Sequence, residues 1–159
     1  MRLNRYNLAL VTVMVMLLSA CGYGLLFDKN KEIPNKTWER SNLLRFDVEV
    51  EDSLASYDFY LNIRNEGTYP YSNLYMFINT TFPNGKSARD TVECILANAS
   101  GRWLGNGLGD IWDNKILFKK NIRFPNTGIY KFEFEHGMRT KDLPSIIDVG
   151  MCIEPHKSK

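Results

Sequence analysis

The stretch IYKFEFEH, residues 129–136, alternates apolar and polar side chains with a period of two residues. An extended chain places the aromatic side chains at positions 130, 132 and 134 on one face and the charged side chains at 131, 133 and 135 on the other. This alternation is typical of a strand with one buried face and one solvated face. The stretch therefore predicts a half-buried β-strand.

The same alternation recurs along most of the chain. It is found in residues 45–50, 57–64, 74–82, 115–124 and 146–154. In the last run, one face carries Ile147, Val149, Met151 and Ile153. Turn-forming residues separate the runs at 64–73, 83–86 and 125–128. Residues 90–100 fit either a strand or a short helix.

About seven short strands, each with one apolar face, must bury those faces against one another. Two packed antiparallel sheets achieve this at the present chain length. We therefore predict an all-β fold, an antiparallel β-sandwich, of which a jelly roll is one form. A closed barrel is the alternative.

Residues 1–20 have the features of an export signal. Arg2 and Arg5 form a basic start, and residues 8–18 are apolar apart from Thr12. A helix of 11 residues spans about half of the roughly 30 Å hydrocarbon core of a bilayer. The run is therefore too short for a transmembrane anchor and fits the apolar region of a signal peptide.

The sequence LSAC, residues 18–21, resembles the bacterial lipobox. The resemblance implies diacylglycerol on the Cys21 thiol, cleavage after Ala20 and acylation of the new N-terminus. Three acyl chains make a stable membrane anchor, whereas one chain binds marginally. The alternative is a simple signal peptide followed by a chance cysteine.

We expect four regions in the chain. They are a signal peptide at 1–20, a lipidated tether at 21–36, a β-sandwich domain at 37–155 and a flexible tail at 156–159. Removal of the signal leaves 18 basic and 18 acidic residues, which are interspersed. This balance argues against nucleic acid and against electrostatic membrane binding. Cys94 and Cys152 then remain, either as a disulfide of an exported chain or as buried free thiols.

The stretch GRWLGNGLGDIW, residues 101–112, contains four glycines. A phosphate-binding loop needs set glycine spacing and a following helix. Here Asp110 stands where a dinucleotide motif needs glycine, and the next periodic run alternates as a strand does. We therefore expect a loop that uses several positive φ angles. Its tryptophans, Trp103 and Trp112, either cover the sandwich or form a candidate partner surface.

Catalytic chemistry finds little support in the residues. The two histidines are expected at a solvated strand end, His136, and in the flexible tail, His156. No cysteine or histidine cluster has zinc-ligand spacing. Asp47, Glu49 and Glu51 fit a solvated strand face, whose like charge can protect a sheet edge. We predict no catalytic residue, no metal site and no cofactor.

Several aromatic residues alternate outward from the predicted core. They include Tyr60, Tyr75 and Phe77. Either these side chains form the second buried face of a central strand, or they form a surface for a sugar or a protein.

Three stretches closely resemble the GldH family of gliding-motility-associated lipoproteins of the Bacteroidetes. They are RNEGTYPYSNLYMFI at 64–78, GRWLGNGLGDI at 101–111 and MRTKDLPSIIDVG at 138–150. The resemblance extends from about Phe27 to Glu154. The lipobox, with Cys21 as its acylated residue, agrees with it independently.

The resemblance implies a non-enzymatic lipoprotein of the cell envelope. Family members are associated with gliding motility and with the type IX secretion machinery, and no catalytic activity is attached to them. The implied partners are the membrane, through Cys21, and envelope proteins of that machinery. A glycan- or ligand-binding sandwich is the alternative, and a small hydrolase is a third hypothesis.

Two further expectations depend on a host of this phylum. Surface-exposed lipoproteins of the phylum tend to carry an acidic run after the lipidated cysteine, whereas Asp28 is the one acid in GYGLLFDK at 22–29. We therefore expect an outer-membrane lipoprotein that faces the periplasm. Exported proteins of the phylum also resemble one another in O-glycosylation at Asp-Ser/Thr-apolar triplets. DSL at 52–54 and DTV at 90–92 make Ser53 and Thr91 candidate sites.

Overall fold

The computed structural model describes residues 24–157 of the 159-residue chain. The expected signal peptide and Cys21 lie outside the described residues. Strands make up nearly all of the regular structure, and one short 3-10 turn, η1 (Pro34–Lys36), interrupts them.

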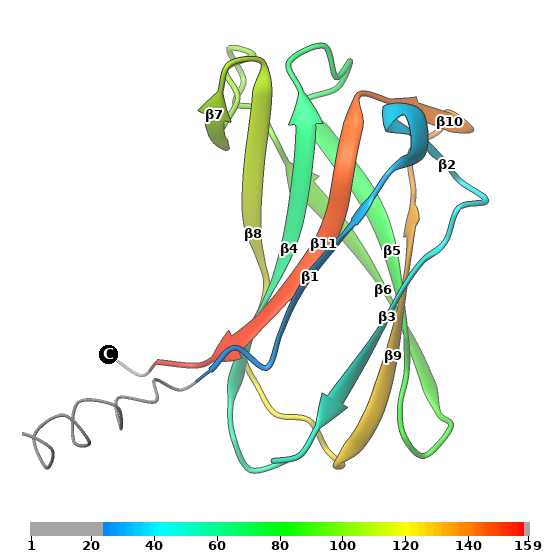
Figure 1. The fold of residues 1–159 in the computed structure, drawn as a ribbon, viewed down its shortest axis with the longest axis vertical. Coiled ribbons are helices and arrows are strands. Elements are labelled where there is room, and N and C mark those ends of the chain that lie inside the picture. The colour runs from blue at the N-terminus through cyan, green and yellow to red at the C-terminus, as the bar shows by residue number, and fades with distance from the viewer. Residues whose placement is uncertain (1–23, 158–159) are drawn as a thin grey trace, which may run out of the picture.

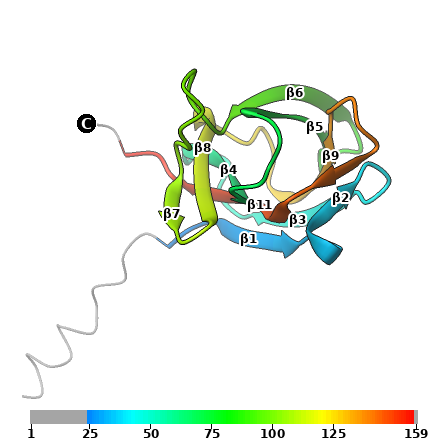
Figure 2. The ribbon, with the colours of Figure 1, turned by 90° about the horizontal axis from the view of Figure 1, so that it is seen from above.

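Two antiparallel sheets pack face to face (Figures 1 and 2). The first sheet contains, in spatial order, β1 (Phe27–Glu32), β11 (Ile146–Pro155), β4 (Tyr57–Glu66), β8 (Ile111–Ile122) and β7 (Asn106–Leu108). The second contains β3 (Leu44–Val50), β9 (Gly128–His136), β5 (Asn73–Thr81) and β6 (Ser87–Ile95). The short strands β2 (Thr37–Glu39) and β10 (Asp142–Pro144) pair with each other.

The strand order is that of a jelly roll. Numbered among themselves, the eight strands longer than three residues run 1-8-3-6 in one sheet and 2-7-4-5 in the other. Two such sheets form a jelly roll built from two Greek keys. The predicted antiparallel β-sandwich is confirmed. The two sheets remain separate within residues 24–157, so the barrel alternative is not formed.

The core lies between the two sheets and follows the predicted alternation. Tyr130, Phe132 and Phe134 of β9 are buried. The ring of Phe132 meets that of Phe59 in the opposite sheet edge to face, with centroids 5.4 Å apart. Full burial of one large apolar side chain contributes about 1.5–3 kcal/mol. The interleaved aromatic faces therefore hold the two sheets together.

The expected tether is shorter than 21–36, because residues 27–36 belong to the fold. β1 pairs with β11 over six residues, and η1 follows directly. Flanking hydrogen bonds run from Leu26 N to Ile153 O at 2.9 Å and from Ile33 N to Ile147 O at 2.8 Å. FDKNKE has a single apolar residue, so the backbone ladder rather than an apolar face holds this strand. Alternation therefore could not reveal it.

A bulge changes the predicted face of the last strand at its start. The register shifts between Ile146 and Asp148. As a result Ile146 is buried and Ile147 is half-buried, while Val149, Met151 and Ile153 lie in the core as predicted. Residues 90–95 of the ambiguous stretch lie in strand β6.

The sandwich has two ends, which we call lower and upper after Figure 1. At the lower end lie the β3–β4, β5–β6 and β8–β9 connections, residues 51–56, 82–86 and 123–127. At the upper end lie η1, the β4–β5 connection and the glycine-rich segment that leads into β7. β1 starts toward the lower end, beside the last residues of β11.

Candidate functional site

The glycine-rich segment forms a hairpin at the upper end of the sandwich (Figure 1). β7 pairs with the start of β8, with Gly107 opposite Trp112. Gly109 has a φ of 64°, which a tight turn needs and glycine adopts without steric cost. The N–H of Gly67 donates to the carbonyl of Asp110 at 2.8 Å. The hairpin is therefore fixed to the β4–β5 connection.

Close packing, rather than positive φ, explains the two central glycines of this segment. A Cβ on Gly107 would lie 2.6 Å from the Trp112 ring, and one on Gly105 would lie 2.6 Å from the carbonyl oxygen of Asp113. Two of the four glycines, at 101 and 109, have positive φ. The expectation of several positive φ angles is thus met at two positions. At the other two, glycine makes room for neighbouring atoms.

Trp103 and Trp112 are both half-buried. Trp112 lies across Gly107, as the distance above shows. Trp103 packs on the core with its ring centroid 6.3 Å from that of Tyr69, and its backbone forms an isolated bridge with Ala97. Both rings therefore contribute to packing and expose one part to solvent.

The most exposed apolar side chains of the segment are Leu104, Leu108 and Ile111, which we call the tip residues. Their exposed fractions are 58%, 84% and 39%. Sequence reasoning concentrated on the tryptophans and missed them. A signal was present, since Leu104 and Leu108 are each followed by glycine in a stretch without alternation, where no buried face can receive a leucine.

The segment that carries the tip residues is well braced. Tyr69 is buried, and its hydroxyl donates to Asn73 O at 2.9 Å. Burial raises the pKa of Tyr69, so this hydroxyl stays protonated. Asn98 Oδ1 accepts from the backbone N–H of Ser100 at 3.0 Å and of Arg102 at 2.9 Å. The tip residues therefore extend from an ordered scaffold.

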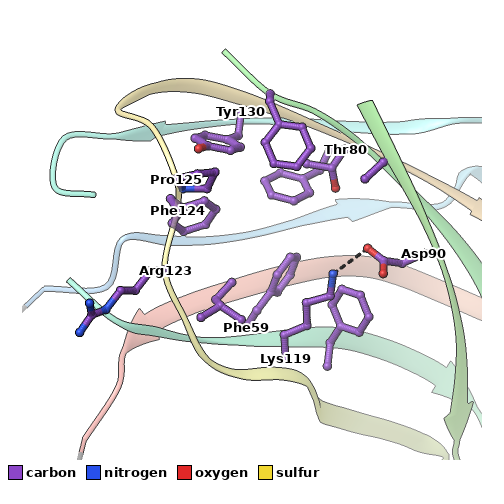
Figure 3. A pocket seen from close by; sticks show the side chains of 13 residues that line it. Phe59, Thr80, Asp90, Lys119, Arg123, Phe124, Pro125 and Tyr130 are labelled. Carbon is purple, nitrogen blue, oxygen red and sulfur yellow. Dashed lines mark hydrogen bonds and ion pairs between the residues drawn. The ribbon is translucent and has the colours of Figure 1, made fainter. Parts of the chain in front are cut away.

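A second candidate site is an apolar cavity between the sheets (Figure 3). Its volume is about 180 Å³. Six aromatic rings line it, those of Phe59, Phe82, Phe118, Phe124, Tyr130 and Phe132. Beside the rings, Lys119 Nζ of β8 lies 2.7 Å from Asp90 Oδ2 of β6, so this ion pair joins the edges of the two sheets.

His136, which we expected to be solvated, is fully buried. Its ring packs against Trp38 with centroids 5.5 Å apart, and Nε2 lies 3.2 Å from Lys141 O. Nε2 therefore carries the proton in the neutral ring, and Nδ1 has no hydrogen-bond partner among the described residues. Burial lowers the pKa of His136, and Arg40 lowers it further.

His156, which we expected in a flexible tail, is also held in place. Its backbone N–H donates to Ser56 O at 2.8 Å, and its Nδ1 lies 2.8 Å from Asp58 Oδ1. Burial raises the pKa of Asp58, but the N–H of Asn121 and the His156 ring outweigh burial and hold that pKa below its usual value. The tail is therefore anchored at least as far as this residue.

The cysteines of the domain are free thiols. Cys94 lies in β6 and Cys152 in β11, so they belong to different sheets, and both are buried. The disulfide alternative is wrong. Burial raises the pKa of Cys94 to about 12, which keeps it as an unreactive thiol.

The outward aromatic residues do not form a bare platform. The Arg89 guanidinium lies 4.3 Å from the Phe77 ring centroid, and Lys115 Nζ lies 4.4 Å from that of Tyr60. Tyr75, on the same strand as Phe77, is 39% exposed. These residues lie on the outer faces of the sheets, and two of the three rings are already covered by cations.

Residues 24–157 contain no group of three or more His, Cys, Asp or Glu side chains placed to hold a metal ion. The carboxylates of Asp47, Glu49 and Glu51 are exposed on the edge strand β3 or just after it. The described part of the chain has no helix that is long and apolar enough to cross a bilayer.

The two candidate glycosylation residues differ in setting. Ser53 is half-buried in the β3–β4 connection, where Asp52 Oδ1 accepts from Leu54 N at 2.8 Å. Thr91 is exposed on β6.

Comparison with known proteins gives one family. A family model described as GldH lipoprotein matches residues 25–153. A protein of Christiangramia forsetii named "Gliding motility lipoprotein GldH homolog" is 35% identical over 147 residues, which cover 88% of this chain and 90% of that protein. The "Gliding motility lipoprotein GldH" of Flavobacterium johnsoniae is 30% identical over 155 residues, which cover 93% of this chain and 96% of that protein.

Proposed function

The chain belongs to the GldH lipoprotein family, and we propose that it is a non-enzymatic envelope lipoprotein that supports gliding motility or type IX secretion machinery through protein contacts. The observation that carries the contact role is the set of exposed tip residues on a braced hairpin. Binding residues are often placed on loops that a rigid scaffold positions. Leu104, Leu108 and Ile111 are of the apolar kind that a partner can bury.

The proposed lipid at Cys21 would orient the domain. Six residue steps separate Cys21 from Phe27, and an extended chain spans at most about 3.6 Å per residue, hence about 20 Å. The lower end would therefore lie close to the membrane. β8 has 12 residues and a length of about 40 Å, so the tip would be held away from the bilayer.

The contact role is tested by crosslinking in cells of the native host. Leu108→Glu should reduce specific crosslinks to envelope proteins at least severalfold, because it places a charge in the apolar contact. Leu117→Glu is the matched control, since Leu117 is an exposed leucine on β8 away from the tip. Equal crosslinking by wild type and both variants would refute the tip as the contact surface.

Lipidation and membrane face have separate tests. Mass spectrometry of the mature chain should show acyl mass on an N-terminal Cys21, and Cys21→Ala should abolish it and block processing. Protease treatment of intact cells should leave a periplasm-facing lipoprotein undigested. Efficient digestion would place the domain on the cell surface instead.

Glycosylation at Ser53 and Thr91 is proposed on the triplet motif and has its own test. Intact mass of wild type, Ser53→Ala and Thr91→Ala, each purified from the native host, should show loss of one glycan mass per occupied site. Identical masses apart from the substitution would exclude that residue.

The glycan-binding alternative is less well supported. It calls for an exposed aromatic platform beside a groove, whereas Phe77 and Tyr60 lie under cationic side chains.

A further inference from the structure

The two sides of the sandwich are closed in different ways. On one side, Phe27 of β1 packs edge to face on Phe46 of β3, with ring centroids 6.1 Å apart. On the other side, β6 ends one sheet, and β8 beyond its short pairing with β7 ends the other. The Lys119–Asp90 ion pair joins these two edges, and the aromatic cavity lies beside it (Figure 3).

β6 is a long and regular edge strand. Its nine residues pair with β5 without a register shift, from Asn73 opposite Ile95 to Thr81 opposite Ser87. The strand contains no proline and no residue with positive φ. Such an edge leaves a row of backbone N–H and C=O groups available to another strand.

The other edges carry features that discourage strand addition. β1 has six residues, and four of them are charged. β3 has exposed acids at alternate positions, and β7 has three residues. β8 contains register shifts and Asn121 at a φ of 53°. Bulges, charges and short length are known means of protecting an edge. β6 has no bulge and is not short, so neither of these two features protects it.

The charged side chains of β6 are bound within the domain. Arg89 lies 3.2 Å from Glu135, Asp90 pairs with Lys119, and Glu93 accepts from Asn73 at 2.6 Å. The inward charge of Asp90 is therefore neutralised. The backbone edge is left open to pairing.

The cavity next to this edge has the size of one side chain. Pockets for drug-sized ligands hold about 300–1,000 Å³, whereas this cavity holds about 180 Å³. Ala88 and Asp90 of β6 belong to its lining. A strand added to β6 would carry every second side chain on the cavity side of the sheet.

We propose that β6 accepts an extended segment of a partner protein as an added strand, with one large apolar side chain of that segment filling the aromatic cavity. Arg123 belongs to the cavity lining, but its guanidinium points away from the rings and donates to Ser56 Oγ at 3.3 Å (Figure 3), so the apolar rings alone select the side chain of the segment.

A second copy of this chain does not fit the same role. The residues of β6 on its cavity side are Ala88, Asp90, Val92 and Cys94. None of them is a large apolar side chain. Pairing of β6 with β6 of another copy would therefore leave both cavities unfilled.

The experiment uses the mature lipidated chain in nanodiscs and a fluorescein-labelled peptide, Thr-Glu-Thr-Phe-Thr-Val-Thr, with acetylated and amidated ends. Anisotropy measures binding, and empty nanodiscs give the background. The peptide should bind at least tenfold more tightly than the same peptide with serine in place of phenylalanine, because the ring is buried. N-methylation at alternate residues should remove binding, and hydrogen exchange should show new protection in residues 87–95.

Matched variants locate the site. Ala88→Trp blocks the cavity side of β6 and should weaken binding at least tenfold, whereas Ser87→Trp on the opposite face should leave it within twofold. Thermal unfolding checks that both variants fold.

Four outcomes would overturn the proposal. They are equal binding of the phenylalanine and serine peptides, protection outside β6 and the cavity, no binding at millimolar peptide, and dimerisation of the chain through β6. The tip variant Leu108→Glu should bind the peptide normally, which separates this site from the proposed contact at the tip.

Discussion

Gly150 is a position at which one methyl group would reach into a neighbouring strand. A Cβ there would lie 2.3 Å from Lys29 O and 2.6 Å from Asn30 Cα of β1. Backbone atoms cannot rotate away as a flexible side chain can, so β1 would have to shift.

Gly150→Ala should therefore lower the free energy of unfolding by about 1–3 kcal/mol, the usual cost of overpacking. Urea denaturation measures it. Gly24→Ala is the control, since a Cβ added there would have no atom beyond its chain neighbours within 4 Å, and it should change stability by less than about 0.5 kcal/mol. Equal stability of the two variants would show that β1 yields freely at this point.

His136 gives the domain a pH dependence of known sign. Burial lowers the pKa of His136, so the unfolded chain takes up this proton at about pH 6.5 while the folded chain takes it up at lower pH. The contribution of His136 to stability is therefore complete above pH 6.5 and is lost as pH falls toward the folded pKa.

Stability of the wild type should thus fall more steeply between pH 7.5 and 5.5 than that of His136→Gln. Urea midpoints at several pH values measure the two slopes, and the comparison removes the contribution of other groups. Parallel slopes would mean that the His136 pKa is the same in the folded and unfolded chains.

The burial of His136 could have been predicted from the sequence. Alternation in IYKFEFEH puts positions 130, 132, 134 and 136 on one face, and the first three are aromatic core residues. Its polarity and its place at the strand end instead favour a solvated position. The polar ring is accommodated because Lys141 O lies within hydrogen-bond distance of Nε2 and Trp38 covers the ring.

At the scale of elements, β1 shows what alternation can and cannot reveal. Long strands such as β4 and β9, with one face in the core, were predicted from their period-two pattern. No periodic pattern marks four of the strands, β1, β2, β7 and β10. β1 has a single apolar residue and the other three have three residues each, so backbone pairing rather than an apolar face positions them. The bulge before Asp148 likewise depends on pairing with β4, which the order of residues does not disclose.

Phe27→Ala tests whether β1 is a structural strand or a dispensable part of the tether. Phe27 is half-buried and packs on Phe46, so its loss should cost about 1–3 kcal/mol, less than for a fully buried phenylalanine. The urea midpoint measures this, and Asp28→Ala at the neighbouring exposed position should change little. An unchanged midpoint for Phe27→Ala would mean that residues 27–32 do not stabilise the domain and act as part of the tether.

At the scale of the whole molecule, the sequence was sufficient for the fold class and for the family. Both depend on features repeated along the chain, namely strand alternation and three long matching stretches. The tip residues and the cavity could not be predicted in this way, because no repeated feature of the sequence marks them. The cavity is lined by rings from several strands and connections, and its existence depends on how two sheets pack. No local pattern carries that information.

The proposed orientation of the molecule on the membrane can be tested with two matched leucines. Leu54 lies in the β3–β4 connection at the lower end and Leu108 at the upper end, and their exposed fractions are 81% and 84%. Each is replaced by cysteine in the lipidated chain and labelled with the same fluorophore. Cys94 and Cys152 are buried free thiols and should not react under native conditions.

A quencher attached to lipid headgroups acts over a short distance, so it should strongly quench the label at position 54 and leave that at 108 nearly unaffected. This follows because six extended residues can span at most about 20 Å between Cys21 and Phe27, while a strand of 12 residues separates the two ends. Equal quenching would mean that the sandwich lies along the bilayer. Stronger quenching at 108 would place the tip residues on the membrane and would replace the proposed protein contact with a lipid contact.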